Sequence, residues 1–274
     1  MKKIASLLQE NRPLIMGVVN VTPDSFSDGG EFLSLAAALE HANYLQECGA
    51  DIIDIGGEST RPGAKPISSS EELQRVMPVI ERLRYASDVP ISVDTSKAVV
   101  MEKAIECGAT LINDVYSLRK PGTLDVVAGS DAYVCLMHMK GSPQNMQDRP
   151  NYKDLLLEVR AFLSDRVVDC EKKGISADRL IVDIGFGFGK TPSGNLQLIN
   201  NLDFFKEIGL PIMVGASRKS TIKKICGDQL GGSLAAALFA VKNGAKILRV
   251  HDVKETVAAL KVWKSISEER LVDW

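Results

Sequence analysis

The chain has 274 residues, of which 45% are hydrophobic and 25% are charged. This balance is typical of a globular protein with a substantial apolar core, and it excludes disordered and collagen-like chains. Because 33 Lys and Arg residues oppose 35 Asp and Glu residues, the net charge is only −2. The protein lacks the overall positive field that attracts a nucleic-acid backbone, so we expect no nucleic-acid partner and only local anion sites.

The sequence predicts neither a membrane anchor nor an export signal. Residues 1–10 include too few apolar side chains for the core of a signal peptide. No uncharged apolar run reaches the ~20 residues that a membrane-spanning helix needs. The five cysteines are odd in number and form no C-x-x-C pair, which indicates reduced thiols rather than disulfides or a zinc site. We therefore expect a soluble cytoplasmic protein.

Eight short apolar segments, rich in β-branched residues, are spaced along the chain. They are residues 14–21, 51–55, 91–93, 111–112, 133–137, 180–184, 211–214 and 246–250. Short runs with little polar alternation are typical of strands that are buried on both faces, as in a parallel sheet covered by helices. The sequence therefore predicts eight such strands.

Segments with helical spacing lie between most of these strands. Apolar residues recur at Leu35, Leu39, Ala42 and Leu45, and again at Leu73, Val76, Ile80 and Leu83. This spacing gives a helix one apolar face. Ser69 and Glu72 have the spacing of a capping box, which predicts a helix start there. Glycines at 49, 108, 174, 209 and 244 precede strands and are expected to end helices in the left-handed conformation.

A strand and a helix that alternate eight times close most simply into a (β/α)8 TIM barrel. An open, doubly wound sheet is the alternative. The Gly-, Ser- and Pro-rich stretches 23–34, 57–70 and 139–151 each follow a predicted strand, so we interpret them as loops at the active-site face. No linker interrupts the chain, and we expect residues 1–274 to form a single domain.

The carboxyl ends of barrel strands are where active sites lie in this fold. Polar residues stand at every predicted strand end: Asn20, residues 58–61, Asp94, Asn113, Asp114, His138, Asp183, residues 217–220 and residues 249–252. The helix-to-strand junctions carry mainly Gly, Ala and Pro. We therefore expect a single polar rim.

The chemistry of the rim favours a flat, nitrogen-rich ligand. Asp94 and Asp183 suit an acid–base pair, metal ligands or acceptors for the N–H edge of a heterocycle. No cluster of His, Cys, Asp and Glu accompanies them, so a tightly held protein metal site is not expected. Acceptors for a heterocycle fit best, since Asn113 both donates and accepts.

Two segments are candidates for anion binding. Residues 217–220 follow a strand and open a helix, where free N–H groups favour a carboxylate or phosphate. Arg249 and His251 are two residues apart on a strand and share one face, which predicts a cationic pair for an oxyanion. His138 and His41 have no such partner and are interpreted as structural residues.

The segment G-F-G-F-G-K at 185–190 is not a nucleotide-binding P-loop. Three residues separate its first glycine from Gly-Lys, whereas a P-loop needs four. We interpret it as a tight turn that lets the backbone approach a flat ligand, with Phe188 as a stacking wall. Lys190 is expected to be a surface charge or a residue at a helix start.

Eight segments together resemble the dihydropteroate synthases of folate biosynthesis. They are residues 16–30 (M-G-V-V-N-V-T-P-D-S-F-S-D-G-G), 54–63 (D-I-G-G-E-S-T-R-P-G), 91–97, 112–114, 136–139, 185–190, 217–220 and 249–253. They occur in the family's order. Two departures affect local loop shape only: Ile184 stands where the family often has Pro, and residues 227–232 form a shorter segment than in many relatives.

The resemblance implies a TIM-barrel transferase that joins 6-hydroxymethyl-7,8-dihydropterin diphosphate to 4-aminobenzoate, releasing 7,8-dihydropteroate and diphosphate. It implies a pterin site of Asp94, Asn113, Met137, Asp183 and Lys219. It implies a diphosphate site of Asn20, Thr60, Arg249 and His251, with Mg2+ at Asn20. It implies an aminobenzoate site of Arg61, Pro62, Phe188 and Ser220.

The expected catalytic residues are Asp94, Asp183, Lys219, Arg249 and His251. Diphosphate is expected to leave first, after which the aromatic amine attacks the resulting cation. By the same resemblance, sulfonamides compete for the aminobenzoate site and the protein is a possible homodimer. The apolar stretch 234–241 is interpreted as core rather than as an interface. A corrinoid-dependent methyltransferase and a non-catalytic pterin-binding protein are the rival functions.

Overall fold

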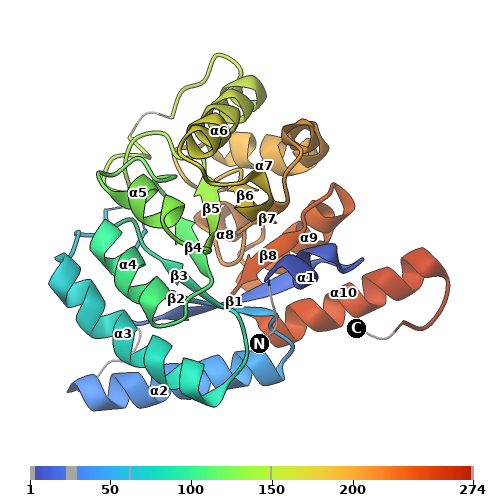
Figure 1. Ribbon diagram of the computed structural model, residues 1–274. Helices are drawn as coiled ribbons and strands as arrows, with labels where there is room; N and C mark the ends of the chain where they lie inside the picture. The colour runs from blue at the N-terminus through green and yellow to red at the C-terminus, as the bar shows by residue number, and fades with distance from the viewer. Residues whose placement is uncertain (1–3, 23–29, 62, 149, 273–274) are drawn as a thin grey trace.

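The computed structural model describes residues 4–22, 30–61, 63–148 and 150–272. Eight parallel strands form a closed barrel in sequence order (Figure 1). They are β1 (Leu14–Asn20), β2 (Ile52–Gly56), β3 (Ile91–Asp94), β4 (Leu111–Asp114), β5 (Tyr133–Met137), β6 (Leu180–Asp183), β7 (Ile212–Val214) and β8 (Ile247–Val250). Because β8 pairs with β1, with Leu14 opposite Ile247, the sheet has no edge. The predicted (β/α)8 barrel is confirmed, and the open sheet is excluded.

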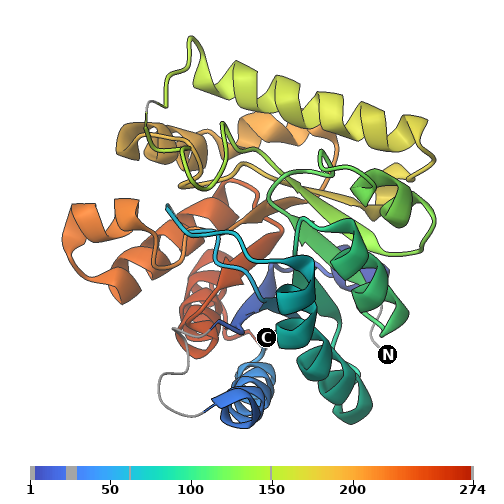
Figure 2. The same cartoon turned by 90° about the vertical axis from the view of Figure 1, so that its left-hand side faces the viewer.

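Helices cover the outside of the barrel (Figures 1 and 2). The α-helices are α1 (Ile4–Gln9), α2 (Gly30–Glu47), α3 (Ser69–Ala86), α4 (Ala98–Glu106), α5 (Thr123–Ala128), α6 (Leu155–Lys172), α7 (Pro192–Asn200), α8 (Ser220–Cys226), α9 (Gln229–Lys242) and α10 (Val253–Glu268). Two 3-10 helices, η2 (Ala177–Arg179) and η3 (Leu202–Ile208), precede β6 and β7. Across the described ranges, none of the helices is sufficiently long and apolar to cross a bilayer.

Apolar side chains pack on both faces of the barrel wall. On the inside, Ile4 and Leu7 of α1 cluster with residues near the starts of the strands, so α1 covers the amino-terminal end of the barrel. On the outside, Val76, Ile80 and Leu83 of α3 are fully buried in the layer between helices and strands. Burial on both faces explains why the strands are continuous apolar runs.

Glycine ends the helices where the sequence indicated. Gly49, Gly108 and Gly244 have φ angles of +103°, +97° and +109°, which a side chain with a Cβ adopts only at a cost. Gly174 and Gly209 also have positive φ. At Gly49, Gly108, Gly209 and Gly244 the chain therefore turns from a helix into a strand within a few residues, whereas η2 follows Gly174 before β6 begins.

The predicted capping box is wrong by one residue. The N-cap of α3 is Ser68, whose Oγ accepts a hydrogen bond from the N–H of Glu71 at 3.1 Å. Glu72 is fully buried instead, and its carboxylate binds the ammonium group of Lys97. Glu72 is therefore used to pair a buried charge rather than to cap the helix. The spacing of Ser69 and Glu72 in the sequence does not reveal this contact.

Candidate active site

The carboxyl ends of the strands converge on one cavity at the mouth of the barrel. Its lining includes Asp94, Asn113, Val115, Met137, Asp183, Phe186, Phe188, Gly215, Lys219 and Arg249. These residues come from β3, β4, β5, β6 and β8 and from the turns after β4, β6 and β7. The predicted pterin set is thus brought together, and Phe188 and Arg249 join it.

A second polar cavity adjoins the first, because Asp94 lines both. It is formed by the loop after β2, with Thr60, and by the loop after β5, with Pro143 and Gln144. Arg61 is exposed, and Pro62 lies outside the described residues, as do residues 23–29 of the predicted loop 23–34. The predicted contact of Pro62 therefore stays a prediction.

The loop 57–70 is held to the barrel by a buried ion cluster. The Nζ of Lys97 donates to Glu58 Oε2 at 2.9 Å and also to Glu72. The other oxygen of Glu58 accepts from the N–H of Ile67 at 2.8 Å. These contacts fix the two ends of the loop, and Thr60 lies between them.

The remaining predicted residues stand at or after the ends of β1, β7 and β8, at the same end of the barrel as the central cavity. Asn20 is the last residue of β1 and is partly buried. Ser220 is the exposed first residue of α8, directly after Lys219. His251 follows β8 and is partly buried. The polar groups are therefore buried near the strands and exposed farther out on the rim.

Arg249 links three strands inside the barrel mouth. Its Nε donates to Asp54 Oδ2 at 2.7 Å, and its Nη2 donates to Asp94 Oδ2 at 2.9 Å. Asn113 Nδ2 also approaches Asp54 Oδ2, at 3.3 Å. Burial opposes the charge of Arg249, but the two carboxylates outweigh it and raise the guanidinium pKa. Arg249 is therefore a compensated cation that retains further N–H donors for an anion.

Asp54 is the site residue that the sequence analysis did not single out. It is fully buried in the middle of β2, and its Oδ1 has no hydrogen-bond partner among the described residues. Unpaired charges are rarely buried, so a carboxylate inside the apolar run 52–56 was the available signal. Its partner lies on β8, almost 200 residues away in sequence, as the separation of 195 between Asp54 and Arg249 shows.

The two predicted carboxylates are buried in different surroundings. Burial raises the pKa of Asp94 to about 7; Arg249 opposes this shift and Asp54 adds to it. Burial also raises the pKa of Asp183, while the N–H of Gly185, which donates to its Oδ1 at 2.7 Å, opposes the shift. Both carboxyl groups are therefore protonated more readily than a solvent-exposed aspartate.

Lys219 faces Asp183 and the ring of Phe188. Its Nζ lies 4.2 Å from the centroid of Phe188, a cation–π contact. Burial, followed by the charge of Arg249, lowers the Lys219 pKa to about 8, while Asp183 and Asp94 oppose this change. The ammonium group therefore stays close to the carboxylates that line the cavity.

Lys190 is not the surface charge that the sequence predicted. Its side chain is only 2% exposed, and its Nζ lies 2.8 to 3.2 Å from the carbonyl oxygens of Gly185, Phe188 and His138 and 2.9 Å from His138 Nδ1. Burial lowers its pKa to about 7. The backbone carbonyls of the turn point inward, and the ammonium group of Lys190 donates hydrogen bonds to them. His138 is structural, as predicted.

Glycine allows this turn to press against the end of β5. Gly185 has a φ of +68°, and a Cβ there would lie 1.8 Å from the carbonyl oxygen of His138. Gly187 and Gly189 also have positive φ. The turn thereby seats Phe188 in a cluster with Val115 and the three methionines Met137, Met139 and Met146.

The predicted cationic pair of Arg249 and His251 is wrong in its charge. Burial, followed by the nearby charges of Arg249 and Arg218, lowers the pKa of His251 to about 3, so the imidazole is neutral at physiological pH. His251 Nδ1 lies 3.1 Å from Ser217 Oγ. His251 therefore contributes a neutral donor or acceptor rather than a second positive charge.

The oxygen donors at the barrel mouth suit a magnesium ion that is held mainly by water and a bound phosphate compound rather than by protein side chains. Within the described ranges, no group of three His, Cys, Asp or Glu side chains could hold a metal. The amide oxygen of Asn20 is a hard donor of the kind that Mg2+ accepts, and Mg2+ usually keeps several ligands from water and phosphate.

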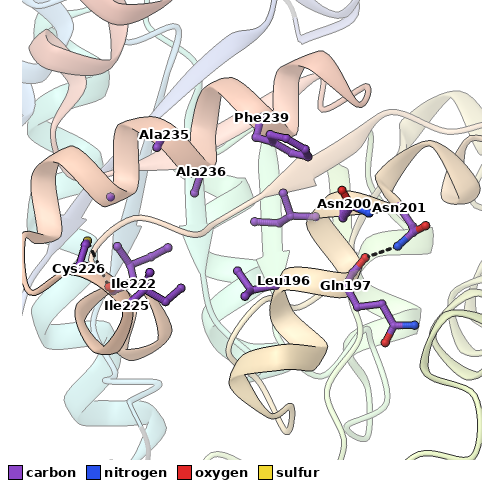
Figure 3. Close-up of a pocket in the computed structure, with 12 residues that line it drawn as sticks. Leu196, Gln197, Asn200, Asn201, Ile222, Ile225, Cys226, Ala235, Ala236 and Phe239 are labelled. Atoms are coloured by element: carbon purple, nitrogen blue, oxygen red, sulfur yellow. Dashed lines mark hydrogen bonds between the residues drawn. The ribbon is translucent and has the colours of Figure 1, made fainter.

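A larger, apolar groove lies outside the barrel, between α7, α8 and α9 (Figure 3). Its lining includes Leu196, Ile222, Ile225, Ala236 and Phe239, and its volume is about 650 Å3. The prediction that residues 234–241 are core is therefore correct for only one side of α9, where Ala237 and Ala240 are buried; Phe239 on the other side is 44% exposed.

Comparisons with known proteins agree with this geometry. Residues 16–251 match the model of the family described as "Pterin binding enzyme". The chain is 49% identical over 259 residues to the dihydropteroate synthase of Escherichia coli, covering 93% of this chain and 92% of that protein. It is 50% identical over 257 residues to the Haemophilus influenzae dihydropteroate synthase, covering 92% and 94%.

Solved structures give the same result. The Yersinia pestis dihydropteroate synthase in a sulfonamide drug complex superposes with a TM-score of 0.89 at 47% identity, covering 94% of this chain and 95% of that one. The Xanthomonas albilineans dihydropteroate synthase with 4-aminobenzoic acid also gives 0.89, at 50% identity and 94% coverage of both chains. The barrel, its polar mouth and these matches together show that the chain belongs to the dihydropteroate synthases, a group of pterin-binding enzymes.

Proposed function

We propose that this protein condenses 6-hydroxymethyl-7,8-dihydropterin diphosphate with 4-aminobenzoate to give 7,8-dihydropteroate and diphosphate. The observation that carries the proposal is the central cavity, in which Asp94, Asn113, Asp183 and Lys219 meet beside Arg249. A relative from X. albilineans has been solved with 7,8-dihydropteroate, at a TM-score of 0.83. The same product suits the cavity of this chain.

The buried carboxylates bind the pterin ring. Asp94 and Asp183 accept hydrogen bonds from its N–H groups, and Asn113 donates and accepts at the same edge. Lys219 donates to a ring acceptor, while Met137 packs against the apolar face. The positions of these side chains around one cavity support the proposed roles.

Asn20, Thr60, Arg249 and His251 surround the diphosphate. Asn20 would hold Mg2+ through its amide oxygen, and the ion would supply positive charge against the leaving group. Arg249 donates to the diphosphate with the N–H groups that do not bind Asp54 and Asp94. His251 adds a neutral hydrogen bond.

The reaction proceeds by loss of diphosphate before the new bond forms. The C–O bond to diphosphate breaks first, and the carbon cation shares its charge with the electron-rich pterin, where Asp94 and Asp183 stabilise it. The neutral aromatic amine then forms the C–N bond and releases a proton. Because the amine needs placement rather than activation, no side chain acts as a nucleophile.

The aminobenzoate lies at the outer part of the mouth. Phe188 forms one wall, Arg61 and Pro62 approach from the loop after β2, and Ser220 places its carboxylate near the start of α8. The loops 23–34 and 57–70 close over the substrates and keep water from the cation. Sulfonamides compete at this position; the Y. pestis relative has been solved in a sulfonamide drug complex.

A second copy of the chain covers the apolar groove between α7, α8 and α9, so the protein works as a homodimer. Leu196 and Ile225 are 49% and 57% exposed there, and exposed apolar patches of this kind mark association surfaces. The five cysteines are free thiols, a state that suits the reducing cytoplasm.

The test is a condensation assay with purified protein, pterin diphosphate, 4-aminobenzoate and Mg2+, omitting each component in turn. We expect release of diphosphate and formation of dihydropteroate only when all are present. Binding of the pterin without diphosphate release under any condition would contradict the proposal and favour a non-catalytic pterin-binding protein. Methyl transfer from a methylated pterin would favour the methyltransferase class.

A further inference from the structure

A hydroxyl group contacts the ring of His251 on the side away from its Nε2. Ser217 stands in the turn between β7 and α8 and is 7% exposed. Its Oγ lies 3.1 Å from His251 Nδ1 and accepts the backbone N–H of the same residue at 3.2 Å. One side chain therefore contacts both the backbone and the ring of His251.

The proton count at Ser217 selects one tautomer of the imidazole. A serine hydroxyl has one proton to donate and two lone pairs to accept with. The backbone N–H of His251 occupies one lone pair, so the O–H is left to donate to Nδ1. If Nδ1 carried the proton instead, the hydroxyl would accept twice and its own proton would need another acceptor. Within the described chain, the structure shows no further partner for Ser217, and an unused buried donor is costly.

A neighbouring ion pair holds this contact in place. Arg218 has a φ of +56°, and its backbone N–H donates to Ser233 Oγ at 2.9 Å. Its guanidinium Nε donates to Asp252 Oδ2 at 3.0 Å, and its Nη2 pairs with the other oxygen of Asp252. Two consecutive residues after β7 thus hold two consecutive residues after β8.

We infer that Ser217 is a positioning residue that fixes the neutral imidazole of His251 with its proton on Nε2, ready to donate a hydrogen bond to the departing diphosphate. The inference rests on the proposed place of His251 at the diphosphate. Without Ser217 the ring can rotate and exchange tautomers, so that a lone pair faces the negative charge for part of the time. We expect this loss of orientation to reduce the stabilisation of the transition state more than it reduces the stability of the fold.

The tautomer is directly measurable, because the chain has only three histidines. In a long-range 1H–15N spectrum of protein labelled at histidine, we expect His251 Nε2 at the position of a protonated nitrogen and Nδ1 at that of an unprotonated one. The variant His251→Gln identifies the signals. In Ser217→Ala, we expect the two His251 nitrogens to move towards averaged positions while His41 and His138 stay unchanged.

Kinetics distinguishes positioning from a general loss of structure. Ser217→Ala is expected to lower kcat/KM for the pterin diphosphate about tenfold, with KM for 4-aminobenzoate within twofold of the parent. Ser217→Thr, which keeps the hydroxyl, is expected to restore most of the activity and the parent His251 spectrum. The matched control is Ser130→Ala: Ser130 Oγ also accepts one backbone N–H, that of Ala132, and donates to the carbonyl of Val127, but before β5 at the opposite end of the barrel. Its kinetics should not change.

Each outcome supports or overturns the inference. A parent spectrum with the proton on Nδ1, or an unchanged His251 spectrum in Ser217→Ala, overturns it. An equal loss for both substrates, matched by a lower unfolding temperature, also overturns it. His251→Ala tests the proposed site separately: if that variant has a parental KM and kcat with the pterin diphosphate, the placement of His251 fails, whatever Ser217 does.

Discussion

Arg249 is charged, buried and already paired, because its guanidinium bonds to Asp54 and Asp94 at once. A buried ion pair contributes little net stability, but the loss of one partner leaves the other charge uncompensated. Asp54 therefore acts through Arg249, which it holds at the place where an anion is expected to bind.

We expect Asp54→Asn to lower the free energy of unfolding by about 3 kcal/mol and to lower kcat/KM for the pterin diphosphate by about tenfold or more. Urea unfolding and steady-state kinetics measure the two effects. The matched control is Asp51→Asn, which breaks the bond from Arg12 Nη1 to Asp51 Oδ2 at 2.9 Å before β2. That variant should lose stability but keep its kcat/KM. Parental kinetics in Asp54→Asn would contradict the role given to Asp54.

In the proposed function, Asp94 and Asp183 bind the pterin ring. Asp94→Ala or Asp183→Ala should weaken pterin binding about 10- to 100-fold, because each removes a charged hydrogen-bond acceptor, and turnover should fall accordingly. Calorimetric titration with a pterin that lacks the diphosphate measures this directly. Near-normal kinetics in either variant would refute the proposed geometry.

The raised pKa of Asp94 predicts an unusual pH profile. The ionised carboxylate accepts hydrogen bonds at both oxygens, whereas protonation turns one oxygen into a donor, and burial raises the pKa of Asp94 to about 7. We therefore expect kcat/KM for the pterin diphosphate to rise with pH through about 7 and then level off, whereas an ordinary carboxyl would place this limb near pH ~4. Asp94→Asn should lose the limb. A profile that is flat between pH 5 and 8 would show that Asp94 titrates below this range.

The convergence of Asp94, Asn113, Asp183 and Lys219 on one cavity was readable from the sequence, but the charge states of the neighbouring groups were not. Asp94, Asn113 and Asp183 lie at strand ends and Lys219 follows β7, and strand ends must meet in a barrel. By contrast, the sequence of a glycine-rich turn followed by lysine does not show whether the lysine is exposed to solvent or buried. The burial of Lys190 depends on carbonyls that converge only after the turn has formed.

Among the elements, the turn after β6 has the least freedom. Gly185 presses against His138, and Lys190 joins the turn to the end of β5. The pattern G-F-G-F-G-K at 185–190 predicted a tight turn with Phe188 beside the ligand site. Both predictions depend on the conformational freedom of glycines within these six residues. The start of α3 was misplaced by one residue because Glu72 is used by Lys97, which lies on a different unit of the barrel.

Two glycine substitutions separate backbone strain from steric conflict. Gly185→Ala should cost far more than strain alone and should disrupt Phe188, because its Cβ would meet the His138 carbonyl at 1.8 Å. Gly209→Ala is the control: it has a φ of +78° but open space around the Cβ position, so we expect a loss of about 1 kcal/mol. Thermal unfolding and KM for 4-aminobenzoate report the two effects. Equal losses of stability would contradict the close contact.

At the scale of the whole molecule, the barrel was predictable because each of its eight units repeats the same local signals, and errors in one unit do not change the closure. The outer surface was not predictable in this way. Residues 234–241 have the apolar content of a core helix, yet one side of α9 borders the groove, and helical spacing alone does not say which neighbours cover a face.

The proposed homodimer is tested at the groove. Phe239→Glu should convert a dimer into a monomer, because it places a charge in the apolar contact, and sedimentation velocity measures the change in mass. Ile266→Glu on α10, where the side chain is 72% exposed and outside the groove lining, is the control and should leave the mass unchanged. A monomeric parent protein would end the proposal.

Helix α1 closes the amino-terminal end of the barrel with Ile4 and Leu7, and the strand interior above it is apolar. In the described part of the chain, the barrel is therefore closed at its amino-terminal end, and substrates reach the site from the carboxyl-terminal end. In the proposed site the pterin lies deeper than the aminobenzoate, so we expect the pterin diphosphate to bind before 4-aminobenzoate. We therefore expect ordered kinetics, set by the shape of the barrel rather than by any one side chain.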